Sequence, residues 1–171
     1  NELVKEHFKN SIKTKKEILN NIEIINQISK LAENCFETLK NEGKIIFAGN
    51  GGSFSDAQHL STEFVSKFQI ERLPLASIAL GTNNSSISAI GNDYGFENIF
   101  SRELEAFGQK KDIFIALSTS GKSKNILQAI KKSKQMGLKS ICLTGITGGD
   151  VNKECECIKV PSNNVAKKEN F

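Results

Sequence analysis

The chain has 171 residues, of which 38% are hydrophobic and 25% are charged, and its formal net charge is +4. This length suits one domain, and the apolar content is sufficient for a core, which excludes two independent domains and a disordered chain. No apolar run approaches the roughly 20 residues of a membrane-spanning helix, and the first residues do not resemble a secretion signal, so we expect a cytoplasmic protein without a membrane partner.

Residues 1–42 are predicted to form a long helical region. Two apolar stripes run along its second half, one with Ile18, Ile22, Ile25, Ala32, Phe36 and Leu39, the other with Ile24, Ile28, Leu31 and Cys35. A helix that is apolar on two sides needs two partners. One side can cover a sheet, and the other side suggests packing against another subunit, so we expect an oligomer.

Five short apolar runs after this region have the character of buried strands. They span residues 44–48, 75–80, 112–117, 138–143 and 156–160. Helical stretches lie between most of them, and this alternation predicts an α/β domain over residues 43–171, with a five-stranded, mostly parallel sheet flanked by helices. Ligands of such domains bind beyond the carboxyl ends of the strands. The loops after the strands are therefore the place to look for function.

The first of these loops is a glycine-rich turn, residues 49–53, that opens a helix. Its glycines allow a ligand close to the backbone, and free N–H groups at the helix start attract anions. A dinucleotide fingerprint would need glycine where Phe54 stands and an acidic residue after the second strand, and both are missing. A phosphate-binding P-loop is excluded because no Gly-Lys-Ser/Thr follows. A purely structural turn stays an alternative.

The helix after this turn carries a polar face with a distinctive pair. Its expected core stripe comprises Phe54, Ala57, Leu60, Phe64 and Phe68, and its opposite face comprises Gly52, Asp56, His59 and Glu63. His59 and Glu63 are four residues apart, a spacing that suits two ligands of one metal ion or a proton-transfer pair. An exposed ion pair explains the same spacing.

The loop after the third strand, residues 118–123, contains four hydroxyl side chains at the start of a helix. Hydroxyls and unpaired N–H groups there make a neutral cradle for a phosphate group, although N-capping needs only one hydroxyl. Residues 110–139 hold eight lysines and one acidic residue. This positive charge could favour the binding of an anion. A lysine-rich helix face that points to solvent explains it as well. No nucleic-acid motif is present, so no nucleic-acid partner is expected.

Asn92 and Asp93 could hydrogen-bond to sugar hydroxyls, or could form an ordinary turn beside glycine. The four cysteines are too few and too scattered for a disulfide framework and are expected to be reduced thiols. Cys155 and Cys157 would face one side of a strand, where we interpret them as small apolar packing residues.

Taken together, these motifs resemble the sugar isomerase (SIS) superfamily, and within it the enzymes that isomerise seven-carbon sugar phosphates. The resemblance covers nearly the whole chain and rests on Gly49–Ser53, Asp56-Ala57-x-His59, Glu63, Gly91–Phe96, Phe100–Arg102 and Ser118–Ser123. It implies a single SIS domain, a homotetramer, and interconversion of sedoheptulose 7-phosphate and D-glycero-D-manno-heptose 7-phosphate for bacterial surface polysaccharide.

The resemblance also implies roles for individual residues. Glu63 would be the catalytic carboxylate, and it would share a zinc ion with His59. The substrate would be bound by Asn50, Gly51, Gly52, Glu63, Asn92, Asp93, Ser118, Thr119, Ser120 and Ser123. A sugar-phosphate sensor or a partner-docking protein without catalytic activity is the alternative function.

The end of the chain departs from the superfamily pattern. A helix with a Gln and a His follows the last strand in that pattern, and it would supply the remaining ligands of one zinc ion per subunit. Residues 160–167 match the approach to that helix, but residues 168–171 do not continue it. We expect that a segment between Lys167 and Lys168 is missing from this sequence.

Overall fold

Within residues 1–162, which the computed structural model describes, five strands form one sheet in which every neighbouring pair is parallel. The strands lie in the order β2-β1-β3-β4-β5. Their bounds are β1 Ile45–Gly49, β2 Ser77–Ala79, β3 Ile113–Ser118, β4 Lys139–Gly145 and β5 Glu156–Val160. The predicted α/β fold is therefore confirmed, and each of the five predicted runs overlaps one strand, with ends that differ by at most two residues.

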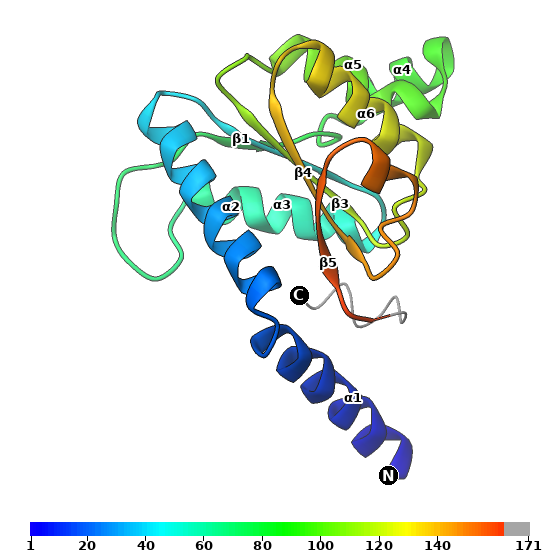
Figure 1. Ribbon diagram of the computed structural model, residues 1–171. Coiled ribbons are helices and arrows are strands. Elements are labelled where there is room, and N and C mark those ends of the chain that lie inside the picture. Colours follow the sequence, from blue (N-terminus) through cyan, green and yellow to red (C-terminus); the bar gives the residue numbers. More distant parts are fainter. Residues whose placement is uncertain (163–171) are drawn as a thin grey trace.

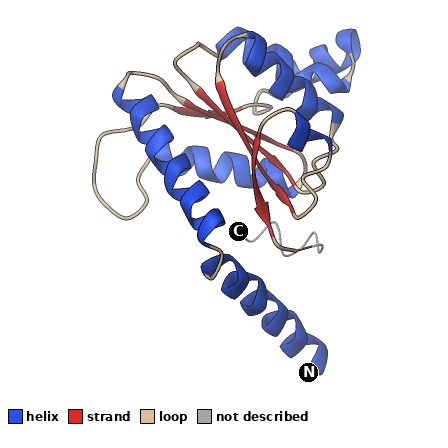
Figure 2. Ribbon diagram, viewed as in Figure 1, coloured by secondary structure: helices blue, strands red, loops and turns tan. Residues whose placement is uncertain are grey.

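Helices cover both faces of the sheet (Figures 1 and 2). One face packs against α2 (Ile22–Lys40) and α3 (Gly52–Val65). The other face packs against α4 (Asn84–Tyr94), α5 (Ile99–Phe107) and α6 (Lys124–Gln135). Two short 3-10 helices, η1 (Phe96–Asn98) and η2 (Asp150–Lys153), precede α5 and β5. None of the helices in the described part of the chain is long and apolar enough to cross a membrane.

The two central strands are apolar on both faces. All five residues of β1 and all six of β3 are buried, as expected for parallel strands sandwiched between two helical layers. Successive residues of each strand point to opposite faces of the sheet. Ile46 and Phe114 pack against α4, α5 and α6, whereas Phe47 and Ile115 pack against α2 and α3. This double burial explains why both strands appear as unbroken apolar runs in the sequence.

The N-terminal region consists of two helices, α1 (Glu2–Leu19) and α2. Asn21 begins α2, since its side-chain oxygen accepts hydrogen bonds from the N–H groups of Glu23 and Ile24, which is ordinary N-capping. In Figure 1, α1 extends away from the sheet and its covering helices. The division of the chain at residues 42 and 43, with the first part in oligomer packing, stays a prediction.

The two predicted stripes of this region have different environments. The sequence predicts that one side covers the sheet, and the structure shows that this is the stripe with Ile24, Ile28, Leu31 and Cys35, joined by Ile18 and Leu39 of the other stripe. The two stripes are therefore not separate faces, because Ile18, near the end of α1, and Leu39, near the end of α2, pack in the same cluster. Ile22 and Phe36 remain 72% and 63% exposed. One apolar side of the region is thus uncovered in a single chain.

The expected core stripe of α3 is correct in part. Ala57, Leu60 and Phe64 pack against the sheet, but α3 ends at Val65, and Phe68 lies beyond it with 71% of its surface exposed. The guanidinium of Arg72 donates hydrogen bonds to the carbonyl oxygens of Glu63, Phe64 and Ser66. These carbonyls at the helix end have no partner within the helix. Arg72 therefore stabilises a termination that helical periodicity did not predict.

A buried charge joins the beginnings of the two central strands. The Asp112 carboxylate is 2% exposed and accepts hydrogen bonds from the backbone N–H groups of Lys44, at 2.9 Å, and Gln109, at 2.8 Å. It also pairs with the ammonium group of Lys44. Three donors converge on one carboxylate, so its removal leaves several of them without an acceptor.

We predict that Asp112→Ala lowers the free energy of unfolding by about 2 to 4 kcal/mol, because it removes one partner of a buried, hydrogen-bonded ion pair. Urea unfolding measures the change. Glu105→Ala is the control: Glu105 pairs with Lys132 at an exposed position, and its loss should cost less than about 1 kcal/mol. Equal effects of the two substitutions would contradict the prediction.

Candidate active site

A pocket of about 490 Å³ lies where α3 faces the carboxyl ends of β3, β4 and β5. It is lined by Ser53, Asp56, His59, Leu60, Leu117, Ser118, Thr119, Leu143, Thr144 and Val160. The polar residues come from two sources, the start of α3 and the ends of neighbouring strands. The pocket therefore lies at the edge of the sheet where the sequence predicted that ligands bind.

Two hydroxyl groups on this wall have no hydrogen-bond partner among residues 1–162. Ser118 and Thr144 are Cα partners in the β3–β4 ladder and are 5% and 3% exposed. Their side-chain oxygens are buried and unpaired within the described residues. Buried polar atoms are nearly always hydrogen-bonded, so these adjacent hydroxyls are suited to bind the oxygen atoms of a ligand. Sequence analysis identified Ser118 but not Thr144, because their pairing depends on strand register.

The loop after β3 is held in place by the loop after β4. Thr119 and Gly121 accept backbone hydrogen bonds from Gly145, at 3.2 Å, and Val151, at 3.1 Å. The hydroxyl of Ser120 accepts from the N–H of Lys122 at 3.2 Å. Ser123 is the N-cap residue of α6, but its side chain makes no capping hydrogen bond. Ser123 thus does not cap the helix with its side chain, and the N–H of Ile126 in the first turn of α6 donates to the side-chain oxygen of Asn125 at 2.9 Å.

The glycine turn after β1 is tied to the start of α6 by a pair of side-chain amides. Asn50 donates to Asn125 at 2.9 Å, and Asn125 donates to Asn50 at 2.8 Å. Asn125 is 3% exposed. The two residues are 75 positions apart, so nothing in the sequence signalled this contact. It fixes the distance between the predicted sugar-binding turn and the predicted phosphate-binding loop.

The predicted site residues do not all lie around one cavity. Asn50 and Gly51 line a smaller cavity of about 180 Å³ toward α4 and α5. Asn92 and Asp93 are exposed in the last turn of α4, where the Asn92 amide donates to the Asp93 carboxylate at 2.7 Å. They do not line the main pocket. The simple turn that was the alternative for these two residues is wrong, because they are helical.

His59 and Glu63 form the contact that their spacing predicted. His59 Nε2 lies 3.1 Å from Glu63 Oε1, with side chains that are 71% and 31% exposed. His59 lines the pocket, and Glu63 lies one turn further along α3. An imidazole nitrogen and a carboxylate oxygen are both ordinary zinc ligands. However, no group of three or more His, Cys, Asp or Glu residues in the described part could hold a metal ion.

The pair therefore fits part of a zinc site and does not complete one. The further ligands were expected beyond residue 167, and the predicted gap between Lys167 and Lys168 lies outside the described residues. Within residues 1–162, the site offers two candidate ligands beside a pocket whose opposite wall carries unpaired hydroxyls. This arrangement can bind an anionic oxygen-rich group at one end and move protons at the other.

Comparisons with known proteins agree on one family. The model of the SIS domain family matches residues 7–145. A phosphoheptose isomerase from Aneurinibacillus thermoaerophilus is 47% identical over 95% of this chain and 82% of its own length. Phosphoheptose isomerase 2 from Campylobacter jejuni is 49% identical over 95% of this chain and 81% of its own. The structure of a phosphoheptose isomerase from Francisella tularensis superimposes with a TM-score of 0.93 at 35% identity, covering 99% of this chain and 90% of that one.

The loop contacts generate a prediction at Gly121. Its φ is +65°, and a Cβ atom there would lie 2.1 Å from the carbonyl oxygen of Gly148. Gly121→Ala should therefore destabilise the protein by roughly 2 to 3 kcal/mol through backbone strain and displacement of the 144–149 loop. Urea unfolding of this variant measures the cost.

Gly91→Ala is the matched control. Gly91 lies in α4 with no heavy atom near the position of an added Cβ and no left-handed φ. Alanine in a helix is favoured over glycine by up to about 1 kcal/mol, so this variant should be as stable as the parent or slightly more stable. If both variants unfolded at the parent's urea concentration, the 118–123 loop would not depend on the close approach at Gly121.

Proposed function

The chain belongs to the phosphoheptose isomerases of the SIS domain family, and we propose that it interconverts sedoheptulose 7-phosphate and D-glycero-D-manno-heptose 7-phosphate. It is an aldose–ketose isomerase with a sugar-phosphate substrate. The product would enter heptose biosynthesis for a bacterial surface polysaccharide. The observation that supports this proposal most directly is that one pocket is lined both by Ser118 and by His59.

The phosphate group of the substrate would bind at the 118–123 loop. Ser118, Thr119, Ser120 and Ser123 supply hydroxyls there, and the start of α6 supplies N–H groups. The positive end of the helix dipole and these neutral donors suit a dianion. The phosphate takes no part in the reaction, so its binding serves to position the reacting carbons near α3.

The sugar would extend from this loop toward the glycine turn and α3. Asn50, Gly51 and Gly52 would contact it on one side, and the amide pair of Asn50 with Asn125 holds that turn beside the phosphate loop. Asn92 and Asp93 would have to reach the sugar from α4, outside the wall of the main pocket. Their role depends on how far the open-chain heptose extends.

The isomerisation moves a carbonyl group between C1 and C2. One group must take a proton from one carbon and return it to the other, and an enediol of the substrate lies between the two steps. Glu63 would carry this proton, because its carboxylate is partly shielded and lies beside the pocket-lining His59. His59, at 3.1 Å, would orient the Glu63 carboxylate through their contact.

We further propose that His59 and Glu63 hold a zinc ion together with ligands outside the described residues. Bound zinc would polarise the substrate oxygens and offset the negative charge that develops on them. The supporting observation is the chemistry of the two side chains, one nitrogen and one oxygen ligand on consecutive turns of α3.

Glu63→Gln tests the catalytic role. The amide has nearly the same shape, and Glu63 does not belong to the core face of α3, so the fold should persist. Loss of the base should lower kcat by at least about 100-fold. Sugar-phosphate affinity should change little, because it rests on the 118–123 loop. Turnover of sedoheptulose 7-phosphate and binding of the same sugar are the two measurements.

Glu17→Gln is the control, since Glu17 forms an i,i+4 pair with Lys13 on α1, away from the pocket. It should turn over at the parent rate. Bound zinc is measured in parallel, and His59→Ala should contain less zinc per chain than the parent. All variants are made in the full-length protein. Parent-level turnover by Glu63→Gln would refute the catalytic role, and unchanged zinc in His59→Ala would refute the zinc site. A full-length parent protein that binds the sugar without converting it would favour a sensor.

We also propose that the enzyme is a homotetramer built on α1 and α2. Large apolar side chains on these helices are at least half exposed in the single chain, namely Leu3, Val4, Phe8, Ile12, Leu19, Ile22 and Phe36. An apolar surface that extends over two helices is unusual for a monomer. A second copy of the same surface would cover it.

Sedimentation should therefore give a tetramer for the parent chain. Phe8→Glu and Ile22→Glu each place a charge in the exposed apolar surface and should shift the protein toward smaller species. Lys13→Glu introduces the same side chain at a polar position of α1 and should sediment like the parent. A parent chain that stays monomeric at micromolar concentration would overturn the proposal.

A further inference from the structure

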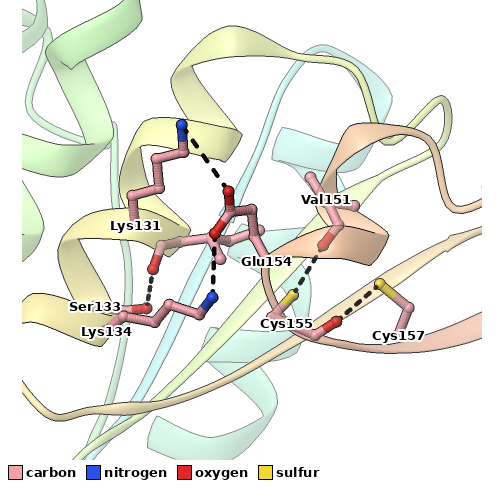
Figure 3. Close-up of polar contacts among 8 residues, drawn as sticks. Lys131, Ser133, Lys134, Val151, Glu154, Cys155 and Cys157 are labelled. Carbon is pink, nitrogen blue, oxygen red and sulfur yellow. Dashed lines mark hydrogen bonds and ion pairs between the residues drawn. The ribbon is translucent and has the colours of Figure 1, made fainter.

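Three of the four cysteines gather at the edge of the sheet, away from the main pocket. Cys142 in β4 and Cys157 in β5 are Cα partners in the ladder, and Cys155 lies just before β5. All three contribute to the apolar cluster on the face covered by α6. Cys142 is fully buried, Cys157 is 8% exposed and Cys155 is half-buried. Figure 3 shows Cys155 and Cys157 where η2 leads into β5.

Each of the three thiols lies within hydrogen-bond reach of a backbone carbonyl oxygen, Cys142 with that of Leu143 at 3.7 Å and Cys155 with that of Val151 at 3.8 Å. As a thiol, Cys157 donates to the carbonyl oxygen of Cys155 at 3.6 Å. As a thiolate, it accepts hydrogen bonds from the thiols of Cys142 and Cys155, and with the nearby Lys159 these bonds lower the pKa of Cys157. The thiolate is the reactive form of cysteine. Cys157, which is 8% exposed, therefore favours the ionised form, and Cys142 is its direct partner in the β4–β5 ladder.

Positive charge lies close to this cluster. A hydrogen bond to Cys157 and burial together raise the pKa of the Cys155 thiol. The positive charge of Lys134 in α6 lowers it, but by less. Glu154 pairs with Lys131 at 4.0 Å and with Lys134 at 3.1 Å (Figure 3). The pairing joins η2 to α6 and holds the start of β5 in position.

Strand register indicates which thiol can bond to Cys157. Neighbouring strands lie about 4.7 to 4.9 Å apart, within the Cα separation of about 4.4 to 6.8 Å that disulfides adopt. Cys142 and Cys157 are directly paired across such a spacing. Cys155 and Cys157 are two residues apart along the chain, roughly 6.6 Å if extended, near the upper limit. Cys142 is therefore the better partner.

We propose that Cys157 is a site of oxidation by hydrogen peroxide and that Cys142 converts the product into a disulfide between β4 and β5. In the first step, the Cys157 thiolate attacks one peroxide oxygen, the O–O bond breaks, and a sulfenic acid and, after protonation, water are formed. In the second step, the Cys142 sulfur displaces the hydroxyl of the sulfenic acid, which leaves as water with the Cys142 proton. Two thiols are oxidised and one peroxide is reduced.

Cys35 provides an internal control in the same molecule. It lies in α2 on the opposite face of the sheet. Burial raises the pKa of Cys35 to about 11, although Lys139 partly offsets this. Its thiolate is therefore scarce at neutral pH, and it should react with peroxide much more slowly than Cys157.

The test uses the whole chain with a modest excess of hydrogen peroxide, followed by denaturation, blocking of free thiols with N-ethylmaleimide, digestion with trypsin and mass spectrometry. Trypsin separates Cys142, in residues 140–153, from Cys155 and Cys157, in residues 154–159. A Cys142–Cys157 disulfide joins these two peptides, and fragmentation locates N-ethylmaleimide on Cys155. Dithiothreitol should separate the peptides again, and Cys35 should carry N-ethylmaleimide throughout.

Each other outcome counts against the proposal. A disulfide inside peptide 154–159 would identify Cys155 as the resolving thiol, and oxidation of Cys35 to the same extent would indicate unselective chemistry. Unmodified Cys142 and Cys157 would show that the cluster is inert. Cys155→Ser keeps the proposed pair and should still form the link, whereas Cys157→Ser should abolish it. The parent measurement stands even if the Cys157 variant folds poorly.

Discussion

The parallel direction of all five strands is the constraint on which the rest of the molecule depends. It brings every carboxyl end to one edge of the sheet, so that loops far apart in the sequence become neighbours. It also requires a covering helix after most strands, and this buries β1 and β3 on both faces. The register between β3 and β4 then sets Ser118 beside Thr144 and leaves two unpaired hydroxyls on the pocket wall. The register between β4 and β5 likewise sets Cys142 beside Cys157.

Contacts between the loops at this edge of the sheet hold them in fixed positions relative to one another. The reciprocal amide pair of Asn50 and Asn125 connects the turn after β1 to the start of α6, and Gly121 packs directly on the backbone of Gly148. Such contacts fix the loops relative to one another before any ligand arrives, which reduces the ordering cost of binding. In the proposed binding mode, with the phosphate at the 118–123 loop, this preorganisation would help to align the substrate with α3.

Helices α1, α2 and α3 are each only partly covered in the single chain. Helix α3 packs with Ala57 and Phe64 on the sheet and directs His59 to the pocket. Its early end, held by Arg72, leaves Phe68 outside the core. Helix α2 likewise packs one apolar side on the sheet and exposes Ile22 and Phe36, whereas α1 reaches that cluster only through Ile18. An exposed apolar surface beside a covered one is the pattern expected of a chain that associates with copies of itself.

The sequence by itself determined the α/β class, the five strands, the glycine turn and the spacing of His59 and Glu63, because each depends on periodicity or on residues within one helical turn. The contact between His59 and Glu63 at 3.1 Å needed nothing more than that spacing. Tertiary structure alone decided the pairing of Asn50 with Asn125, the burial of Asp112 beside Lys44, the packing of Ile18 and Leu39 on the sheet and the end of α3 at Val65. Each joins groups whose separation in space is set by strand register or helix docking rather than by position in the chain, and so no local pattern of residues could encode it.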